Sequence, residues 1–424
     1  MPAAGGAQAL LAEELTAITG APSEHARGGA WVRGDLAAAM RINLHSRLAQ
    51  RVLWPLIDGP YRDEHDLYDL ARHVAWADWL TPQMTLRVDV NAQHSPLRSL
   101  NFAALRIKDA VCDSLRESHG ARPSVDTQRP DLPLALYLGP DHATLYVDTS
   151  GEALFKRGWR DARGGREGVK GEAPLKETLA AAMLAAAGWQ GRAADGVLLD
   201  PCCGAGTIAI EAAQLACGIA PGLNRRFAFE RQLPFQALSA RWSALREEAR
   251  SQIHAPAVAI HAGDVSFRMT DFAQRNAQRA GVAQAIQFKT VDALQRLPPA
   301  ERGVLMLNPP YGERIAPKGS GASRSAYAGE REPQGHRGPH GHQGREAFAD
   351  GGSSAEFYAA LAAHWKQHYA GWSAHLLSPD MKLPSLMRLK ESARVPMWNG
   401  PLECRLFRFD LVAGSNRREP ARGD

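Results

Sequence analysis

The stretch Val197-Leu-Leu-Asp-Pro-Cys-Cys-Gly-Ala-Gly-Thr-Ile-Ala-Ile-Glu-Ala-Ala213 decides the fold of this chain. Its apolar start predicts a β-strand and its Ala- and Ile-rich end predicts an α-helix, with Gly204 and Gly206 in the turn between them. Glycine is needed where the backbone takes a positive φ angle or where a ligand approaches closely. The free N–H groups at the start of the following helix favour an anionic group of a ligand. In an open α/β sheet, nucleotide-like ligands bind at this place, outside the carboxyl end of the strand.

The glycine pattern alone leaves two interpretations open, because such a turn equally serves the packing of a strand against a helix. It departs from the dinucleotide fingerprint, which has a third glycine where this chain has Ala209. It also lacks the lysine of a phosphate-binding loop, so we do not expect a nucleoside triphosphate as the ligand. Further along the chain, Val304-Leu-Met-Leu-Asn-Pro-Pro-Tyr311 predicts a second apolar strand, which ends in Asn308 and two prolines.

Together, these two motifs resemble those of class I S-adenosylmethionine-dependent methyltransferases that modify exocyclic amino groups of bases. Three longer stretches are similar to one branch, the THUMP-containing 23S rRNA guanine-N2-methyltransferases. They are Gly171-Glu-Ala-Pro-Leu-Lys-Glu177, Ile219-Ala-Pro-Gly-Leu223 and Asn308-Pro-Pro-Tyr-Gly-Glu-Arg314. The resemblance covers nearly the whole chain. It implies an α/β fold with a Rossmann-like class I methyltransferase domain, preceded by an α+β module made of a ferredoxin-like unit and an RNA-binding THUMP domain.

The expected elements divide the chain into the same parts. Residues 1–62 alternate helix and strand, which indicates a compact ferredoxin-like unit. Residues 63–157 form the THUMP domain, residues 158–412 the methyltransferase domain, and residues 413–424 a basic tail. The expected helices lie at residues 7–18, 36–44, 63–80, 100–115, 172–187, 238–253, 272–281 and 354–369; the expected strands lie at 29–32, 51–57, 84–90, 133–138, 143–147, 197–199, 257–264, 286–292, 304–307, 375–378 and 402–411.

Two features of the chain differ from what the resemblance implies. Members of the family begin with one more strand before the first helix, and no apolar strand precedes Gln8. We therefore expect the start to be shortened and the sheet of the first unit to lack an edge. We also expect no second methyltransferase domain after the closing strand. The helix at 100–115 has basic residues on its outer face, which is either an RNA contact or a solvated surface.

Composition limits the class of protein. The 424 residues carry a formal charge of +5, a mild basic excess that fits contact with nucleic acid without establishing it. No apolar run approaches the roughly eighteen residues of a membrane span, and the N-terminus lacks the pattern of a secretion signal, so we expect a cytoplasmic protein. The five cysteines are an odd number without zinc spacing, so we expect neither disulfides nor a metal site.

Three aspartates at the ends of expected strands fit the parts of S-adenosylmethionine. Asp200 can accept a hydrogen bond from the α-ammonium group, while the Gly204 and Gly206 backbone lets the methionyl part lie close. Asp264 follows the second strand, where a carboxylate binds the ribose diol, and this chain has Ser266 where the family commonly has a second acid. Asp292 follows the third strand and resembles the residue that accepts from the adenine amino group. Any one of these acids could instead be a helix cap.

Cys202 lies in the same loop, and we assign it to the cofactor-binding site. Its neighbour in the sequence is a second cysteine, Cys203, and the pair suggests a nucleophile. Since no histidine or other base accompanies them, we favour the interpretation that they are small residues that fill a crowded turn.

Asn308, Pro309 and Tyr311 are the expected catalytic residues. An exocyclic amine is a poor nucleophile, because its lone pair is delocalised into the ring. Acceptance of its hydrogens by the Asn308 side chain and the Pro309 carbonyl would hold the nitrogen towards tetrahedral geometry and stabilise the charge that it gains. The prolines stiffen the loop. Tyr311 would stack on a base that has left its helix to reach the methyl group.

Two insertions have open roles. Residues 217–255 contain Arg225, Arg226, Phe227 and Phe229, which could contact phosphate and stack on a base or could simply pack on the sheet edge. Residues 316–354 are rich in Gly, Ser, Arg, His and Pro, which predicts a disordered loop.

The sequence therefore predicts transfer of a methyl group from S-adenosylmethionine to N2 of a guanine in 23S rRNA, with RNA as the partner and no membrane or metal. Three alternatives remain: a tRNA guanine-N2-methyltransferase, a DNA amino-methyltransferase, and a non-catalytic RNA assembly factor. The DNA enzyme would need a domain that reads the major groove, and the sequence shows none. Neither the modified nucleotide nor the oligomeric state can be read from the residues.

Overall fold

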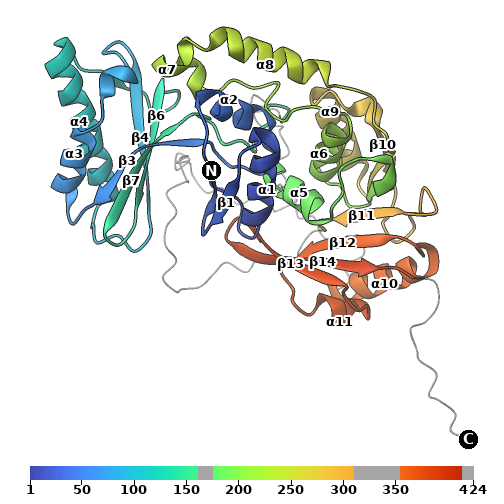
Figure 1. The fold of residues 1–424 in the computed structure, drawn as a ribbon. Coiled ribbons are helices and arrows are strands. Elements are labelled where there is room, and N and C mark those ends of the chain that lie inside the picture. Colours follow the sequence, from blue (N-terminus) through green and yellow to red (C-terminus); the bar gives the residue numbers. More distant parts are fainter. Residues whose placement is uncertain (161–174, 310–353, 413–424) are drawn as a thin grey trace, which may run out of the picture.

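The computed structural model describes residues 1–160, 175–309 and 354–412, and within them a large mixed sheet forms the centre of the catalytic domain (Figure 1). Its strand order is β10-β9-β8-β11-β12-β14-β13. The first five strands in that order run parallel, and β14 pairs antiparallel with both β12 and β13. The bounds are β8 Val197–Asp200, β9 Ile260–Asp264, β10 Ile286–Thr290, β11 Gly303–Leu307, β12 Ser373–Ser378, β13 Ala393–Asn399 and β14 Leu402–Asp410.

The order of this sheet reverses between β8 and β11. From β8 the chain proceeds outward to β9 and β10, and then returns to the other side of β8 with β11 and β12. At such a switch point the connections leave in opposite directions and open a crevice at the carboxyl ends of the strands. The two motifs singled out in the sequence follow β8 and β11, so they leave the sheet on either side of this point.

Helices cover both faces of the sheet (Figure 1). Apolar residues alternate along the central strands, because successive side chains of a strand point to opposite faces. Leu198 and Met306 belong to the apolar core under one group of helices, and Leu199 and Leu305 belong to the core under the other. The first group is α5 Glu177–Ala186, α6 Thr207–Ala216 and α9 Phe267–Arg279; the second is α10 Ser354–His368 and α11 Leu383–Met387; short 3-10 turns lie at η2 Ala193–Asp195 and η4 Ala283–Ala285.

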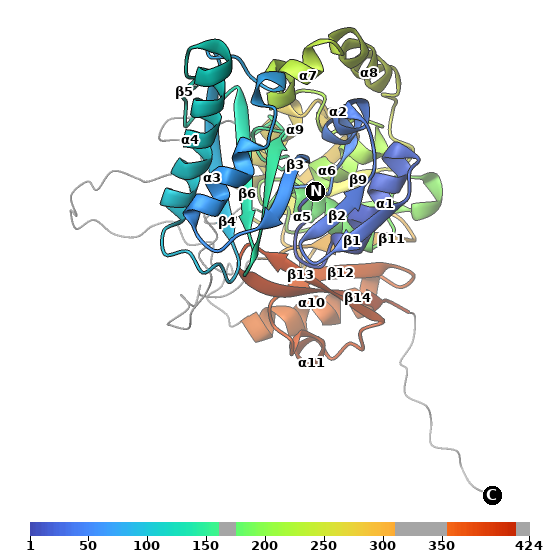
Figure 2. The same cartoon turned by 60° about the vertical axis from the view of Figure 1, so that its left-hand side comes forward.

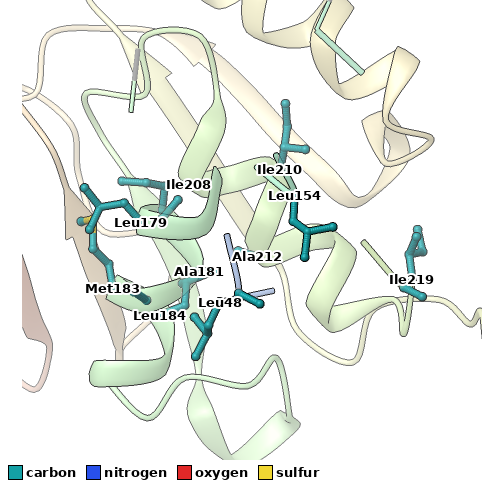
Figure 3. Packing of buried hydrophobic residues seen from close by; sticks show 14 of the residues in the cluster. Leu48, Leu154, Leu179, Ala181, Met183, Leu184, Ile208, Ile210, Ala212 and Ile219 are labelled. Carbon is teal, nitrogen blue, oxygen red and sulfur yellow. The ribbon is translucent and has the colours of Figure 1, made fainter. Parts of the chain in front are cut away.

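The core under the first group is built mainly from small and branched side chains of α5 and α6 (Figure 3). Leu179 and Met183 of α5 lie against Ile208 of α6, and all three are nearly inaccessible to solvent. The glycine loop and the helix α6 that follows it are therefore supported by a close-packed apolar core. The expected helix at 172–187 begins only at Glu177, and residues 161–174 lie outside the described part of the chain.

A second sheet belongs to the N-terminal half, with strand order β3-β7-β6-β4-β5. Two helices cover the face that points away from the catalytic domain, and together they enclose a separate apolar core (Figures 1 and 2). The single helix expected at 63–80 is wrong: it ends at Arg72, and a 3-10 turn follows in which the indole of Trp76 donates to the carbonyl of Ala71 at 2.8 Å. The bounds are β3 Leu53–Pro60, α3 Glu64–Arg72, η1 Trp76–Asp78, β4 Thr85–Ala92, α4 Leu100–His119, β5 Ser124–Val125, β6 Leu132–Leu138 and β7 His142–Asp148.

The first unit consists of α1 Gln8–Thr19, the hairpin β1 Ser23–Ala26 and β2 Gly29–Val32, and α2 Leu36–His45. Before Gln8, Pro2 and Ala3 make isolated bridges with Gly29 and Ala49. The strand expected at 51–57 is β3, and it pairs with β7 of the second sheet rather than with the hairpin.

The insertion at 217–255 joins these parts, and its aromatic residues are buried. It contains η3 Ala228–Arg231, α7 Leu233–Gln236 and α8 Ser239–Ser251. The rings of Phe227 and Phe229 stack at 5.4 Å between centroids, and Trp242 meets both edge-on. The guanidinium of Arg225 donates to the carbonyls of Glu152, Ala153 and Lys156. For Arg225, Phe227 and Phe229 the structure therefore shows the packing interpretation, whereas the side chain of Arg226 is exposed.

Candidate cofactor and catalytic site

The glycine loop, residues 201–206, connects β8 to α6 and needs both of its glycines. Gly204 has a φ of +50° and Gly206 a φ of +83°. A Cβ on Gly206 would lie 3.0 Å from the Cβ of Ala273 in α9, whereas a Cβ on Gly204 would meet only the end of the Met269 side chain at 4.0 Å. Gly206 therefore permits a close helix contact, and Gly204 leaves open space at the carboxyl edge of the sheet.

Three hydrogen bonds fix the course of this loop. The N–H of Cys203 donates to the Gly263 carbonyl in β9 at 2.7 Å, and the N–H of Gly206 donates to the Cys203 carbonyl at 2.7 Å. The side-chain amide of Asn276 in α9 donates to the Ala205 carbonyl at 2.9 Å. Asn276 is not among the site residues expected from the sequence. The signal that could have found it is the spacing of Ala273 and Asn276, an Ala-x-x-Asn pattern in the helix that follows the second strand.

The three aspartates share one local geometry. In each, Oδ1 accepts a hydrogen bond from the backbone N–H two residues later: Asp200 from Cys202 at 3.3 Å, Asp264 from Ser266 at 2.9 Å, and Asp292 from Leu294 at 2.9 Å. Each acid thus caps its own turn, which is the local role considered for it. Capping occupies one carboxylate oxygen and leaves the other for a further partner, so it does not exclude a ligand.

Asp200 is the most buried of the three, with 1% of its surface exposed. Within the described part of the chain, no lysine, arginine or histidine pairs with it. Burial raises the pKa of its carboxyl well above the usual range, and the nearby charge of Asp264 raises it further. A buried carboxylate with no counter-charge is costly, and such sites are common where a cationic ligand binds.

Asp264 connects the second strand to the glycine loop. Its second oxygen, Oδ2, accepts from the backbone N–H of Gly204 at 3.0 Å. Burial raises the pKa of this carboxyl as well. The loop and the acid are therefore in contact, although 60 positions separate Gly204 and Asp264 in the sequence.

Cys202 lies among all three acids. Burial raises the pKa of its thiol well above the usual range, and the charges of Asp200, Asp264 and Asp292 add to this effect. Burial and the charges of Asp200 and Asp264 also raise the pKa of Cys203. Since the thiolate is the reactive form of cysteine, neither residue is suited to be a nucleophile. Their place in the turn agrees with the packing interpretation.

Asn308 and Pro309 follow β11 at the same edge of the sheet. Leu305 of β11 pairs in register with Leu199 of β8, so the two residues after Leu307 leave the sheet beside the start of the glycine loop. Asn308 is partly exposed and Pro309 is buried. Tyr311 and the insertion at 316–353 lie outside the described residues. The structure thus brings Asp200, Cys202, Gly204, Asp264, Asp292 and Asn308 to one edge.

A buried ionic cluster behind the site was missed in the sequence. Glu211 of α6 is fully buried, and its carboxylate pairs with Arg157 at 3.1 Å and with Arg47 at 3.5 Å. Arg157 also donates to the Arg47 carbonyl at 2.7 Å. The available signal was a glutamate within an Ala- and Ile-rich helix, because a charge buried there requires a partner.

The basic face of α4 is neutralised by its neighbours. Lys108 pairs with Asp109 at 2.9 Å, and Arg116 and Arg122 both pair with Asp113, at 3.3 and 2.7 Å. The basic residues seen in the sequence therefore do not form a surface of one sign.

Two absences hold for residues 1–160, 175–309 and 354–412. In these segments, no three His, Cys, Asp or Glu side chains are grouped so that they could hold a metal ion. Nor does any helix there have the length and apolar character of a membrane-spanning segment.

Three family models match successive parts of the chain. Residues 1–53 match the RlmL ferredoxin-like domain, residues 61–148 the THUMP domain, and residues 163–324 the RMKL-like methyltransferase domain. These matches confirm the expected fold class and the resemblance on which it was based.

Relatives and solved structures agree with the models. The chain is 34% identical over 417 residues to a ribosomal RNA large subunit methyltransferase K/L of Shewanella sp. (strain MR-4), and 36% identical over 418 residues to one of Syntrophotalea carbinolica. In each case 96% of this chain and 52% of the relative are covered, so the chain spans about half the length of these relatives. A methyltransferase structure in complex with SAH, SMU.472, superimposes with a TM-score of 0.78 at 25% identity and covers 98% of both chains.

Proposed function

Because the chain belongs to the THUMP-containing methyltransferases with an RMKL-like catalytic domain, we propose that it methylates the exocyclic N2 amine of a guanine in 23S rRNA. S-adenosylmethionine is the methyl donor of this class of enzyme, and it supplies a methyl group already activated by its sulfonium. The observation that carries the proposal is the meeting of the Asp200 loop and the Asn308-Pro309 segment at the switch point of the sheet.

The residues at the carboxyl edge fit this cofactor. Asp200 is buried without a counter-charge, and the α-ammonium of the methionyl part would supply one. Gly204 leaves open space beside the loop, so that the methionyl chain can lie against the backbone there, next to Cys202 and Gly206. Asp264 and Asp292 follow the next two strands outward, in the order in which the ribose and the adenine follow the sulfur.

Asn308 and Pro309 would prepare the amine. The Asn308 side-chain oxygen and the Pro309 carbonyl each accept one hydrogen of the N2 group, so that its lone pair turns out of the ring plane and towards the donor. Pro309 fixes the backbone φ angle, which holds both acceptors in place without the guanine. Tyr311 would stack on the extruded base.

The substrate follows from the two modules considered together. A THUMP domain precedes the catalytic domain, and the relatives are named as methyltransferases of large-subunit ribosomal RNA. A-form RNA hides its base edges in a deep groove, so the module would grip phosphates and 2′-hydroxyls while the catalytic domain receives a flipped guanine. Since ribosomal RNA of bacteria lies in the cytoplasm, we place the protein there as well.

The test is a nucleoside analysis after reaction in vitro. The protein is incubated with radiolabelled S-adenosylmethionine and either transcribed 23S rRNA or transcribed tRNA, and digested RNA is analysed by mass spectrometry. We expect N2-methylguanosine in the 23S rRNA alone. Asn308→Ala should lower kcat by about 10²-fold or more, since it removes one of two acceptors that stabilise the transition state. Asn224→Ala, at an exposed loop position, is the matched control.

Three outcomes would contradict the proposal. They are label in tRNA alone, a methyl group on another atom of the guanine, or full activity of the Asn308→Ala protein.

A further inference from the structure

The segment that joins the two halves of the molecule, residues 149–160, lies against the cofactor loop. It leaves β7 at Asp148 and reaches the catalytic domain at Arg157, whose side chain is buried and pairs with Glu211 of α6. Of the next two residues with side chains, Arg160 contacts Thr207 directly, and the Trp159 carbonyl is connected to Ala205 through Arg279 and Asn276. None of these residues has a role in the function proposed above.

Arg160 joins the start of two helices. One terminal nitrogen of its guanidinium donates both to the hydroxyl of Thr207 at 2.8 Å and to the carbonyl of Leu175 at 2.9 Å. Its Nε lies 2.6 Å from Oε1 of Glu177 in an ion pair. Thr207 is the first residue of α6 and directly follows Gly206, while Glu177 is the first residue of α5 and Leu175 lies two residues before it. A single side chain thus fixes where α5 begins relative to the glycine loop.

A second connection reaches the loop from the same segment. Arg279 of α9 donates from Nε to the Trp159 carbonyl at 2.8 Å and also contacts the side-chain oxygen of Asn276. Asn276 in turn donates to the Ala205 carbonyl at 2.9 Å. Ala205 and Thr207 flank Gly206, so the residues on both sides of this glycine are held from one dipeptide.

We propose that Arg160 is a positioning residue for S-adenosylmethionine, which holds Thr207 and the exit of the glycine loop in the geometry that receives the methionyl part. The inference rests on the proposed function, because it assumes that this loop binds the cofactor. The guanidinium does not touch the cofactor in this account; it acts through Thr207 and through the start of α5.

Lysine cannot replace arginine in this place. Two different nitrogens of the guanidinium are involved: one terminal nitrogen donates to Thr207 and Leu175, and Nε lies at ion-pair distance from Glu177. The single ammonium of lysine cannot occupy both places. The ion pair between Arg160 and Glu177 also affects the protonation of the acid. Glu177 is buried, and burial raises its pKa to about 7, while the charge of Arg160 opposes this rise. Without Arg160 the carboxyl can take up a proton, which allows the variant to fold.

The test compares variants of the full-length protein in steady-state methylation of transcribed 23S rRNA. For Arg160→Gln we expect a rise of about tenfold in KM for S-adenosylmethionine, as for the loss of about 1.4 kcal/mol of binding free energy, with kcat changed less than twofold. Arg160→Lys should not restore the wild-type KM. Arg192→Gln is the matched control, because this arginine forms an exposed pair with Asp195 at the amino end of β8.

Thr207→Val serves as a second variant that keeps the shape of the side chain. Alone it should raise the same KM about threefold, which is in the range for the loss of one hydrogen bond of ordinary strength. Combined with Arg160→Gln, it should cause no further rise in KM, because both changes remove the same hydrogen bond between Arg160 and Thr207. The affinity of each variant for 23S rRNA, measured by filter binding, should stay within twofold of wild type.

An unchanged KM for S-adenosylmethionine in both Arg160→Gln and Thr207→Val would overturn the inference, and so would full rescue by lysine. A fall in kcat alone would also contradict it. Failure of the proposed function looks different, since the wild-type protein itself would then show no binding of S-adenosylmethionine by calorimetry.

Discussion

Two buried carboxylates in the same strand–loop–helix unit differ in whether they have a cationic partner. Glu211, in α6, is fully buried and paired with both Arg157 and Arg47. Asp200, at the end of β8, is 1% exposed and has the backbone N–H of Cys202 but no cationic partner among the described residues. Glu211, which connects the first unit and the joining segment to α6, is paired with two arginines. Asp200 has no such partner, and a cationic ligand would provide the missing positive charge. Burial alone therefore does not distinguish a structural acid from a binding acid; the partner does.

The largest effect should come from breaking the paired acid. Glu211→Ala leaves two guanidinium groups without their carboxylate in the interior, and the loss of one partner of a buried pair costs about 3 to 5 kcal/mol of unfolding free energy. Urea denaturation of the two proteins measures it. A change below about 1 kcal/mol would show that Arg157 and Arg47 reach water or another acceptor, and the contrast with Asp200 would lose its basis.

A pH series should separate the two acids by function. Asp200 has a raised pKa in the free protein, so at low pH it is protonated and cannot pair with the α-ammonium of S-adenosylmethionine. Affinity should be full above the raised pKa and should fall by up to about tenfold per pH unit below it. Calorimetry between pH 5 and pH 8, at pH values where the protein stays folded, measures the dependence. A flat profile would argue that the ammonium binds elsewhere.

The smallest effect should come from an acid that is paired but exposed. Glu247 and Arg250 form an i,i+3 pair at 3.2 Å in α8, and both side chains are open to solvent. Glu247→Ala should change the unfolding free energy by less than about 0.5 kcal/mol, because water screens such pairs. It is the Glu-to-Ala control for Glu211. An equal loss of unfolding free energy in Glu247→Ala and Glu211→Ala would mean that burial does not determine how much an ion pair contributes to stability.

The sequence was sufficient for the centre of the fold, because the information there is local. A strand that ends in Asp200, two glycines with positive φ and an alanine-rich helix together specify the loop, and Asp264 and Asn308 follow strands of the same kind. β13 was not predicted, since Pro396 and charged residues at a sheet edge obscure the strand pattern.

Other features could not be predicted because they depend on contacts between distant segments. Glu211 meets Arg47 and Arg157 only after the first unit, the joining segment and α6 have come together.

The most direct test of the central claim is the Asp200→Asn protein, melted with and without S-adenosylmethionine. In the free protein, the raised pKa of Asp200 means that ionisation costs stability above the ordinary carboxyl pKa of about 4, so the amide should raise Tm at neutral pH, by about 1 to 2 °C for each kcal/mol of unfolding free energy that it adds. The same variant should lose the rise in Tm that S-adenosylmethionine gives the wild type. A lower Tm in the free variant, or an undiminished shift with the cofactor, would contradict the account.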